Sequence, residues 1–135
     1  MLLQQELIKA ARQARNFAYA PYSKFSVGSA LLTKSGEIFT GCNVENVSLG
    51  LTICAERAAV MAALGEGHKD FVAIAVVTDS AEPALPCGAC RQVLAEFNSA
   101  IKIVASTTSG ITQELSLSEL LPRPKQGMPE PSRNV

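Results

Sequence analysis

Apolar side chains recur at offsets of three and four residues in the first part of the chain, between residues 3 and 18. Charged and amide side chains fall mostly between them. Such spacing places the apolar residues on one stripe of an α-helix, so we expect an amphipathic helix packed on a core. Pro21 ends the segment, because a residue that precedes proline is biased away from the helical conformation. The stripe consists of Leu3, Leu7, Ala10, Ala11, Ala14, Phe17 and Ala18.

Extended runs make up most of the middle of the chain. Residues 25–32 and 37–46 are two such runs, and the short Lys34-Ser35-Gly36 turn between them predicts a β-hairpin. The small side chains of residues 28–30 indicate that another element packs closely on the first run. Residues 71–77 are continuously apolar, which is typical of a central strand buried on both faces. Two further strands are expected at 101–105 and 111–115.

Helical composition returns twice between these strands. Residues 54–64 are rich in strong helix formers and are followed by glycines, and residues 87–97 form a second such segment. A loop is expected at 47–52 and a helical turn at 117–121. The resulting order, α-β-β-α-β-α-β-β, predicts an α/β fold with a mixed five-stranded sheet covered by helices.

The composition changes at Pro122. Four prolines fall within the last fourteen residues, and apolar side chains become rare. We therefore expect one domain over residues 1–121 and a proline-rich tail, flexible or partly ordered, over residues 122–135.

Chain length and charge exclude some classes of partner. The 135 residues have the size of a single domain. Twelve basic and twelve acidic residues balance, so the basic excess of a nucleic-acid binder is missing, and small neutral substrates are compatible. No apolar run reaches the ~18 residues that span a bilayer, so no membrane partner is expected. The first residues do not resemble a signal peptide, so we expect a cytoplasmic protein with reduced thiols.

Two short stretches carry candidate metal chemistry: Cys54-Ala55-Glu56-Arg57 and Pro86-Cys87-Gly88-Ala89-Cys90. Cys87 and Cys90 lie on one face of a helix start, and Cys54 begins the other helix. The positive end of a helix dipole stabilises thiolate. Thiolates are zinc ligands, and three protein ligands leave one position for water, as in a catalytic zinc site.

The residues after Cys54 complete this hypothesis. Glu56 can direct a carboxylate at the water without being a ligand, and it can then carry protons. Three thiolates on Zn²⁺ leave a net negative charge, which Arg57 can offset by donating hydrogen bonds to sulfur.

Other interpretations of the cysteines remain open at this point. A disulfide framework is not expected of a cytosolic chain of this size. A closed structural zinc site with Cys42 as the fourth ligand is the main competitor, because structural sites are often Cys₄. Against it, Cys42 is a single cysteine within an expected strand. His68 falls in a polar loop, and we expect it to be exposed and not a ligand.

The pattern C-A-E-R followed by P-C-G-A-C-R-Q, with N-V-E-N upstream, resembles the cytidine deaminase family in its short, homotetrameric, three-cysteine branch. The similarity extends over residues 5–121 and implies the three-layer fold of that family. It implies that zinc-activated water attacks C4 of cytidine or 2′-deoxycytidine and that Glu56 moves protons to N3 and to the departing amine. The products would be uridine or 2′-deoxyuridine and ammonia, as in pyrimidine salvage.

The same resemblance implies a set of substrate contacts. Asn43 and Glu45 would bind ribose hydroxyls, the backbone N–H of Ala55 would meet the base carbonyl O2, and Phe25 would pack on the ring. Two positions depart from the family pattern: Leu49 replaces an aromatic residue common among relatives, and Pro122 is not followed by their phenylalanine. Alternative functions are a deaminase of blasticidin S, a non-catalytic zinc-stabilised binding module and a nucleic-acid editing deaminase.

Overall fold

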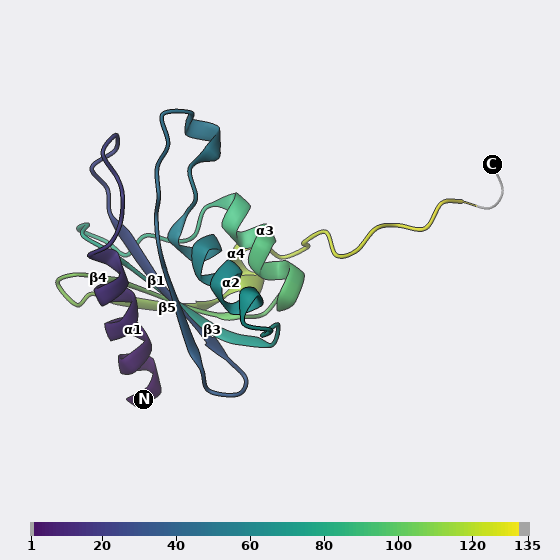
Figure 1. Cartoon of the computed structure of the whole chain (residues 1–135). Coiled ribbons are helices and arrows are strands. Elements are labelled where there is room, and N and C mark those ends of the chain that lie inside the picture. The colour runs from purple at the N-terminus through teal and green to yellow at the C-terminus, as the bar shows by residue number, and fades with distance from the viewer. Residues whose placement is uncertain (1, 133–135) are drawn as a thin grey trace.

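The structure is a computed structural model that describes residues 2–132; Met1 and residues 133–135 lie outside the described part. Five strands form one sheet in the order β2-β1-β3-β4-β5 (Figure 1). The predicted α/β fold with a mixed five-stranded sheet is therefore confirmed. The strands are β1 (Val27–Thr33), β2 (Ile38–Cys42), β3 (Phe71–Thr78), β4 (Lys102–Thr107) and β5 (Thr112–Ser116). The helices are α1 (Leu2–Arg15), η1 (Leu49–Leu51, a 3-10 turn), α2 (Ala55–Gly65), α3 (Gly88–Phe97) and α4 (Leu117–Leu120).

The sheet is mixed because one pair of neighbouring strands is parallel and the others are antiparallel. β1 pairs antiparallel with β2 as the predicted hairpin and with β3 on its other side. β3 pairs parallel with β4, and α3 connects these two strands. Parallel neighbours need such a crossover, whereas antiparallel ones can be joined by a short turn. β3 is consequently the central strand, as its continuous apolar sequence predicted.

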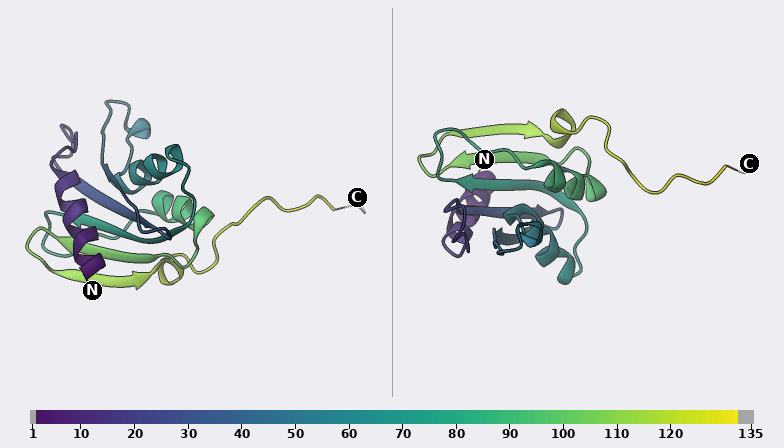
Figure 2. Two further views of the ribbon diagram at one scale, coloured as in Figure 1. Left: turned by 60° about the horizontal axis from the view of Figure 1, so that its bottom comes forward. Right: turned by 90° about the horizontal axis from the view of Figure 1, so that it is seen from above.

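Helices cover both faces of the sheet, so the molecule has three layers (Figure 2). On one face α1 buries Leu7 and Ala11 against the sheet. On the other face α2, α3 and α4 enclose a second cluster with the sheet, to which they contribute Val60, Leu94 and Leu117. The burial of apolar area in these two clusters is the main favourable contribution to folding.

Glycines let α1 and α2 approach the sheet closely. A Cβ built on Gly28 would lie 2.0 Å from the carbonyl oxygen of Ala11, and one on Gly41 would lie 2.4 Å from that of Ala55. Side chains at these positions would therefore clash with helix backbone. The close packing that the small residues 28–30 predicted is present, and Gly41 seats the first turn of α2 directly on β2.

The first helix is shorter than its apolar stripe predicted. It ends at Arg15, and the N–H groups of residues 16–18 bond three residues back in a tightened turn. The next residue, Tyr19, instead exchanges backbone hydrogen bonds with Asn43 and Glu45. Phe17 therefore lies beyond the helix and is 80% exposed, so its expected place in the core was wrong.

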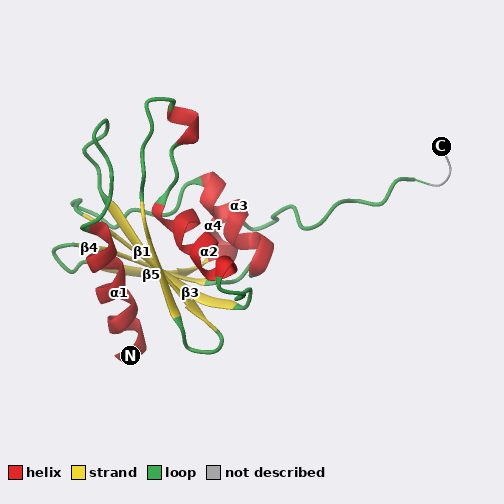
Figure 3. Cartoon of the chain, in the orientation of Figure 1, coloured by secondary structure: helices red, strands yellow, loops and turns green. Residues whose placement is uncertain are grey.

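The remaining segments are loops, drawn green in Figure 3. The loop expected at 47–52 contains the 3-10 turn η1. From Leu121 to Ser132 no described residue belongs to a helix or strand. The start of this tail nevertheless contacts α3, because Gln92 Nε2 donates to the carbonyl of Lys125 (2.9 Å) and Gln126 Nε2 to that of Ala95 (3.3 Å). Within residues 2–132, no helix combines the length and hydrophobicity that crossing a bilayer requires.

Candidate metal centre and active site

Two helix starts bring together the three cysteines of the sequence pattern. Cys54 is the N-cap residue of α2, and Cys87 is the N-cap residue of α3. Cys90 lies one turn into α3 and is fully buried. The first N–H groups of each helix have no acceptor within the helix and carry partial positive charge, which favours anionic sulfur at these positions.

The spacing of the three sulfurs suits one metal ion. The Sγ atoms lie within 4.8 Å of one another, at 3.9 Å between Cys54 and Cys87 and 3.4 Å between Cys87 and Cys90. Zn–S bonds of about 2.3 Å at tetrahedral angles would separate two sulfurs by roughly 3.8 Å. These distances lie on either side of that value and exceed a disulfide bond of about 2.05 Å. The thiolate set therefore fits zinc, and the four cysteines are free thiols.

Proton affinities within the cluster are uneven. The thiol of Cys90 and the guanidinium of Arg57 donate to Cys54 and lower its pKa to about 5 against the effect of its partial burial. The pKa of Cys90 is raised, because it donates to Cys54 and is itself buried. The thiolate of Cys54 thus forms readily, whereas the thiol of Cys90 needs a cation to replace its proton.

Arg57 lies against the cluster, as predicted. Its Nη2 is 3.5 Å from Cys54 Sγ and 3.4 Å from the carbonyl oxygen of Thr52. Its buried Nε has no hydrogen-bond partner among the described residues. A buried guanidinium that is short of acceptors gains from negative charge nearby, so this side chain can offset part of the charge of the sulfurs.

Glu56 is a buried carboxyl group beside the sulfurs. It lies in the first turn of α2 and is 5% exposed. Burial raises its pKa to about 7, and the negative charge of Cys54 adds to this effect. A carboxyl group with a pKa near neutrality can both accept and release a proton at physiological pH.

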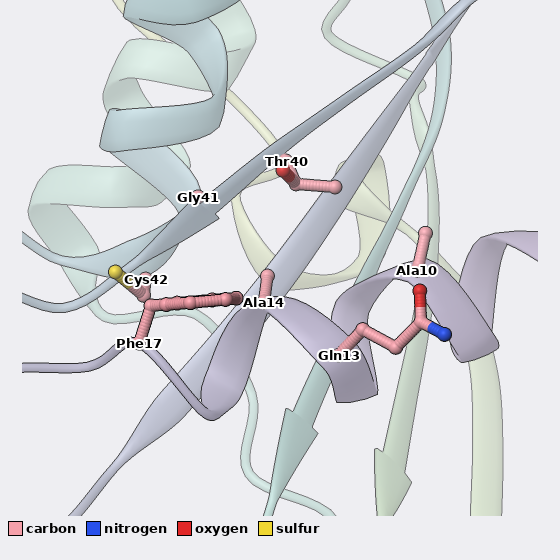
Figure 4. A pocket seen from close by; sticks show the side chains of 7 residues that line it. All are labelled: Ala10, Gln13, Ala14, Phe17, Thr40, Gly41 and Cys42. Atoms are coloured by element: carbon pink, nitrogen blue, oxygen red, sulfur yellow. The ribbon is translucent and has the colours of Figure 1, made fainter.

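Cys42 lies on the opposite side of the sheet from the three-sulfur cluster. Its β-ladder partner is Gly28, whose missing side chain would point at α1. Cys42 lines a groove of about 350 Å³ between α1 and β2, together with Ala14 and Phe17 (Figure 4). Residues 2–132 hold one cluster of potential metal ligands, and Cys42 is not part of it. The four-thiolate alternative therefore has no geometric support.

A cavity of about 260 Å³ opens next to the sulfurs and contains most of the predicted contacts. Cys54 and Cys87 lie on its wall, whereas Cys90 and Arg57 do not line it. Its size suits a ligand of a few rings, since small-molecule sites often begin near 300 Å³. The predicted residues that line it are Phe25, Asn43, Glu45, Cys54, Ala55, Glu56 and Cys87.

Asn43 and Glu45 are already bound by protein groups. The amide of Asn43 donates to the carbonyl of Phe25 (2.8 Å) and accepts from the N–H of Val27 (2.9 Å). Glu45 Oε1 accepts from the N–H groups of Tyr22 and Ser23, and Oε2 accepts from the Ser23 hydroxyl. These bonds lower the pKa of Glu45, that of the Ser23 hydroxyl most of all. Spare lone pairs and one N–H remain for a ligand.

Several lining residues were missed in the sequence. Ser23 is the clearest case, because it touches both Glu45 and the N–H of Phe25. In turns, a serine hydroxyl often accepts a hydrogen bond from the backbone N–H two residues later. The Ser23–Phe25 spacing was therefore a weak signal in the sequence. The others come from chain segments whose proximity only the fold creates: Thr52, Val76, Thr78, Ala84 and Leu85.

His68 is less exposed than the sequence predicted. Its Nε2 lies 3.2 Å from Glu37 Oε2, and its ring stacks at a tilt on Phe39, with centroids 5.2 Å apart. It is half-buried and belongs to the hairpin end of the sheet, away from the cysteines. The prediction that it is not in the metal cluster holds among residues 2–132.

A three-thiolate metal cluster, a buried carboxyl group and an adjoining cavity define a class of zinc-dependent hydrolytic enzymes. The family described as "Cytidine and deoxycytidylate deaminase zinc-binding region" matches residues 1–107. The chain belongs to this family. A cytidine deaminase of Halalkalibacterium halodurans is 56% identical over 119 residues, which are 87% of this chain and 90% of that protein. A cytidine deaminase of Sporosarcina psychrophila is 46% identical and covers similar shares, 87% and 88%.

Solved structures agree with the fold. The crystal structure of cytidine deaminase from Burkholderia pseudomallei superposes with a TM-score of 0.87 at 48% identity and covers 90% of this chain and 98% of that one. Cytidine deaminase from Mycobacterium tuberculosis gives a TM-score of 0.79 at 42% identity, with 90% and 95% covered. The predicted three-layer cytidine-deaminase-like fold and zinc as cofactor are thus confirmed.

Proposed function

We propose that this chain catalyses the hydrolytic deamination of cytidine and 2′-deoxycytidine, which yields uridine or 2′-deoxyuridine and ammonia. The observation that carries the proposal is the buried Glu56 carboxyl group beside three convergent thiols, at the wall of a nucleoside-sized cavity. The family membership and the named relatives support the same reaction.

Cys54, Cys87 and Cys90 would hold the zinc ion. When bound, zinc supplies a Lewis acid that lowers the pKa of water enough to make it a nucleophile near neutral pH. Glu56 would pass one proton from the attacking water to N3 of the pyrimidine. It would then pass the proton of the new C4 hydroxyl to the amine, which leaves as ammonia when the C4–N bond breaks. Its raised pKa suits proton transfer, because a carboxyl group that titrates near neutrality can both accept and donate a proton.

The remaining contacts would orient the nucleoside. Ala55 is the first residue of α2, so its N–H lacks an acceptor in the helix and can donate to the base carbonyl O2. Phe25 is 40% exposed at the cavity and can pack on the pyrimidine ring. Glu45 and Asn43 keep hydrogen-bonding capacity for sugar hydroxyls. A charged acceptor there would favour nucleosides over the free base.

A substrate panel tests the proposed specificity. Zinc-loaded protein should convert cytidine and 2′-deoxycytidine, with much slower turnover of cytosine and blasticidin S, followed by ultraviolet absorbance and ammonia release. Preferred turnover of blasticidin S would replace the proposal by the alternative deaminase. Turnover of cytosine within single-stranded DNA at a rate equal to that of cytidine would instead favour the editing alternative.

We propose further that the protein is a homotetramer. Large apolar side chains are exposed on the loops before β1 and after β2, and exposed apolar patches often mark interfaces. They include Phe17, Tyr22, Val47, Leu49 and Leu51. Light scattering after size exclusion should give four times the chain mass, and a monomer would contradict this. A role in pyrimidine salvage and a cytoplasmic location stay predictions.

A further inference from the structure

The segment of residues 19–27 is bonded along its length to the strand end at residues 43–45. Tyr19 N donates to the carbonyl of Asn43 (2.9 Å), and Glu45 N donates to the carbonyl of Tyr19 (2.8 Å). Farther along, the Asn43 side chain bonds to Phe25 and Val27, and Asn43 N donates to the carbonyl of Val27 (3.2 Å). The segment is therefore held at both ends by backbone and amide bonds.

The middle of this segment is held by Glu45, whose Oε1 accepts from the N–H groups of Tyr22 and Ser23, and by the hydroxyl group of Ser23. Ser23 Oγ donates to Glu45 Oε2 and accepts from the N–H of Phe25 (3.0 Å). One atom thus joins the carboxylate at the sugar side of the cavity to the backbone of the aromatic residue at the base side. Both Ser23 and Phe25 line the cavity.

The backbone at this point is in an uncommon conformation. Lys24, between Ser23 and Phe25, has a φ of 62°, and it is the one residue other than glycine with positive φ in the described chain. L-residues rarely adopt this region, and they keep it where neighbouring contacts fix the chain. Lys24 N also donates to the carbonyl of Ala20 (3.0 Å). The turn is consequently a defined geometry and not a loose loop.

We propose that Ser23 is a positioning residue that couples sugar recognition at Glu45 to the placement of Phe25 against the base. This inference rests on the proposed function. Ser23 uses its one proton on Glu45 and a lone pair on Phe25, so a shift of the carboxylate toward a sugar hydroxyl moves the backbone that carries the aromatic ring. Glu45 Oε2 retains a lone pair for that hydroxyl.

Kinetics of Ser23→Ala with two substrates test the coupling. The substrates are cytidine and 2′,3′-dideoxycytidine, which lacks the sugar hydroxyls that Glu45 would bind. For cytidine we expect KM to rise about tenfold with little change in kcat, the size of one lost bond to a charged group. For dideoxycytidine we expect a loss at least about fivefold smaller, because the coupling to Glu45 is not engaged. Equal losses for both substrates, or none, would overturn the proposal.

Two further variants complete the experiment. Ser23→Thr keeps the hydroxyl and should restore cytidine KM to within about twofold of the parent. Ser35→Ala is the matched control: this exposed serine also bonds through its hydroxyl, to Thr33, but lies at the hairpin turn, beyond the other end of β1. It should leave both substrates unchanged. Failure of Ser23→Thr to rescue would refute the role of the hydroxyl.

Amide exchange separates this inference from the proposed function. In the parent protein the N–H groups of Tyr22, Ser23 and Phe25 should exchange at least about tenfold more slowly than in an unstructured peptide, and Ser23→Ala should remove protection at Phe25. Unprotected amides would remove the structural basis of the coupling whatever the enzyme's activity. A protein with protected amides that turns over no cytosine nucleoside would contradict the proposed function instead.

Discussion

At the scale of single residues, the environment of two charged groups decides the chemistry of the site. Glu56 is buried with a raised pKa, whereas Glu45 is bonded to three donors with a lowered pKa. Burial raises the pKa of Glu56, whereas hydrogen bonds lower that of Glu45, so the two glutamates lose their protons in different pH ranges. The first suits proton transfer, and the second suits a permanent acceptor for hydroxyl groups.

The pKa of Glu56 predicts a pH dependence of stability for the metal-free protein. Its pKa is raised from 4.5 to about 7, so between these values the folded state holds a proton that the unfolded state has lost. Stability therefore falls as pH rises through this window, by up to about 3 kcal/mol. Glu56→Gln cannot titrate and should gain stability relative to the parent between pH 5 and pH 8. Urea unfolding with a chelator and a reductant would measure this; a constant difference would contradict it.

Arg57 predicts an effect on metal affinity that does not require an activity assay. Removal of its contact with Cys54 in Arg57→Ala should weaken zinc binding about 10- to 100-fold, as for other partners of metal ligands. Competition with a chromophoric chelator gives the affinity directly. Arg12→Ala, an exposed position on α1, serves as the control. Equal affinity in both variants would show that Arg57 does not compensate the sulfur charge.

At the scale of secondary-structure elements, the site depends on where α2 and α3 begin. The first turn of α2 packs on Ser29 and Gly41, which face each other across the β1–β2 ladder. Ser29 Oγ donates to the carbonyl of Ala55 (2.6 Å), and Gly41, which has no side chain, lets the helix backbone come close to β2. Arg91 fixes the start of α3 in a similar way, since its Nε donates to the carbonyl of Pro86 (2.7 Å) and its Nη1 to that of Leu120 (3.2 Å). Both contacts hold backbone that adjoins the cysteines of the three-sulfur cluster, at Ala55 and at Pro86.

Gly41→Ala should therefore be strongly destabilising. The added Cβ would meet the backbone of α2 at 2.4–2.5 Å, and we expect a loss of about 2–3 kcal/mol in the free energy of unfolding. Gly50→Ala is the matched control, because nothing lies within 4 Å of a Cβ there and its φ is not positive. Urea denaturation of the two variants provides the comparison. Similar stabilities would mean that α2 is not seated as described.

Local patterns predicted the elements better than the contacts between them. The two extended runs with their Lys34-Ser35-Gly36 turn, and the apolar run of β3, predicted the strands of the sheet. The cysteines at the helix starts predicted the metal cluster. The stripe of α1 did not predict that Tyr19 bonds to Asn43, which ends the helix before Phe17. Likewise, the bond between Ser23 and Glu45 joins residues 22 positions apart, and no periodicity relates them.

At the scale of the whole molecule, the division into a domain over 1–121 and a tail over 122–135 stays a prediction. Two hydrogen bonds join the start of the tail to α3, from Gln92 to Lys125 and from Gln126 to Ala95. Deletion of residues 123–135 should then cost less than about 2 kcal/mol of stability, since each neutral bond contributes roughly 1 kcal/mol. Thermal unfolding and zinc content of the truncated chain test this. Loss of folding or of zinc would place the tail within the domain.

The central claim is that zinc-loaded protein deaminates cytidine with Glu56 as the proton carrier. The most direct measurement is the loss of cytidine absorbance with parent and Glu56→Gln, each with its zinc content determined. We predict conversion to uridine by the parent, one zinc per chain in both proteins, and at least about a hundredfold slower turnover by the variant. An inactive zinc-loaded parent, or a zinc-loaded variant as fast as the parent, would contradict the account.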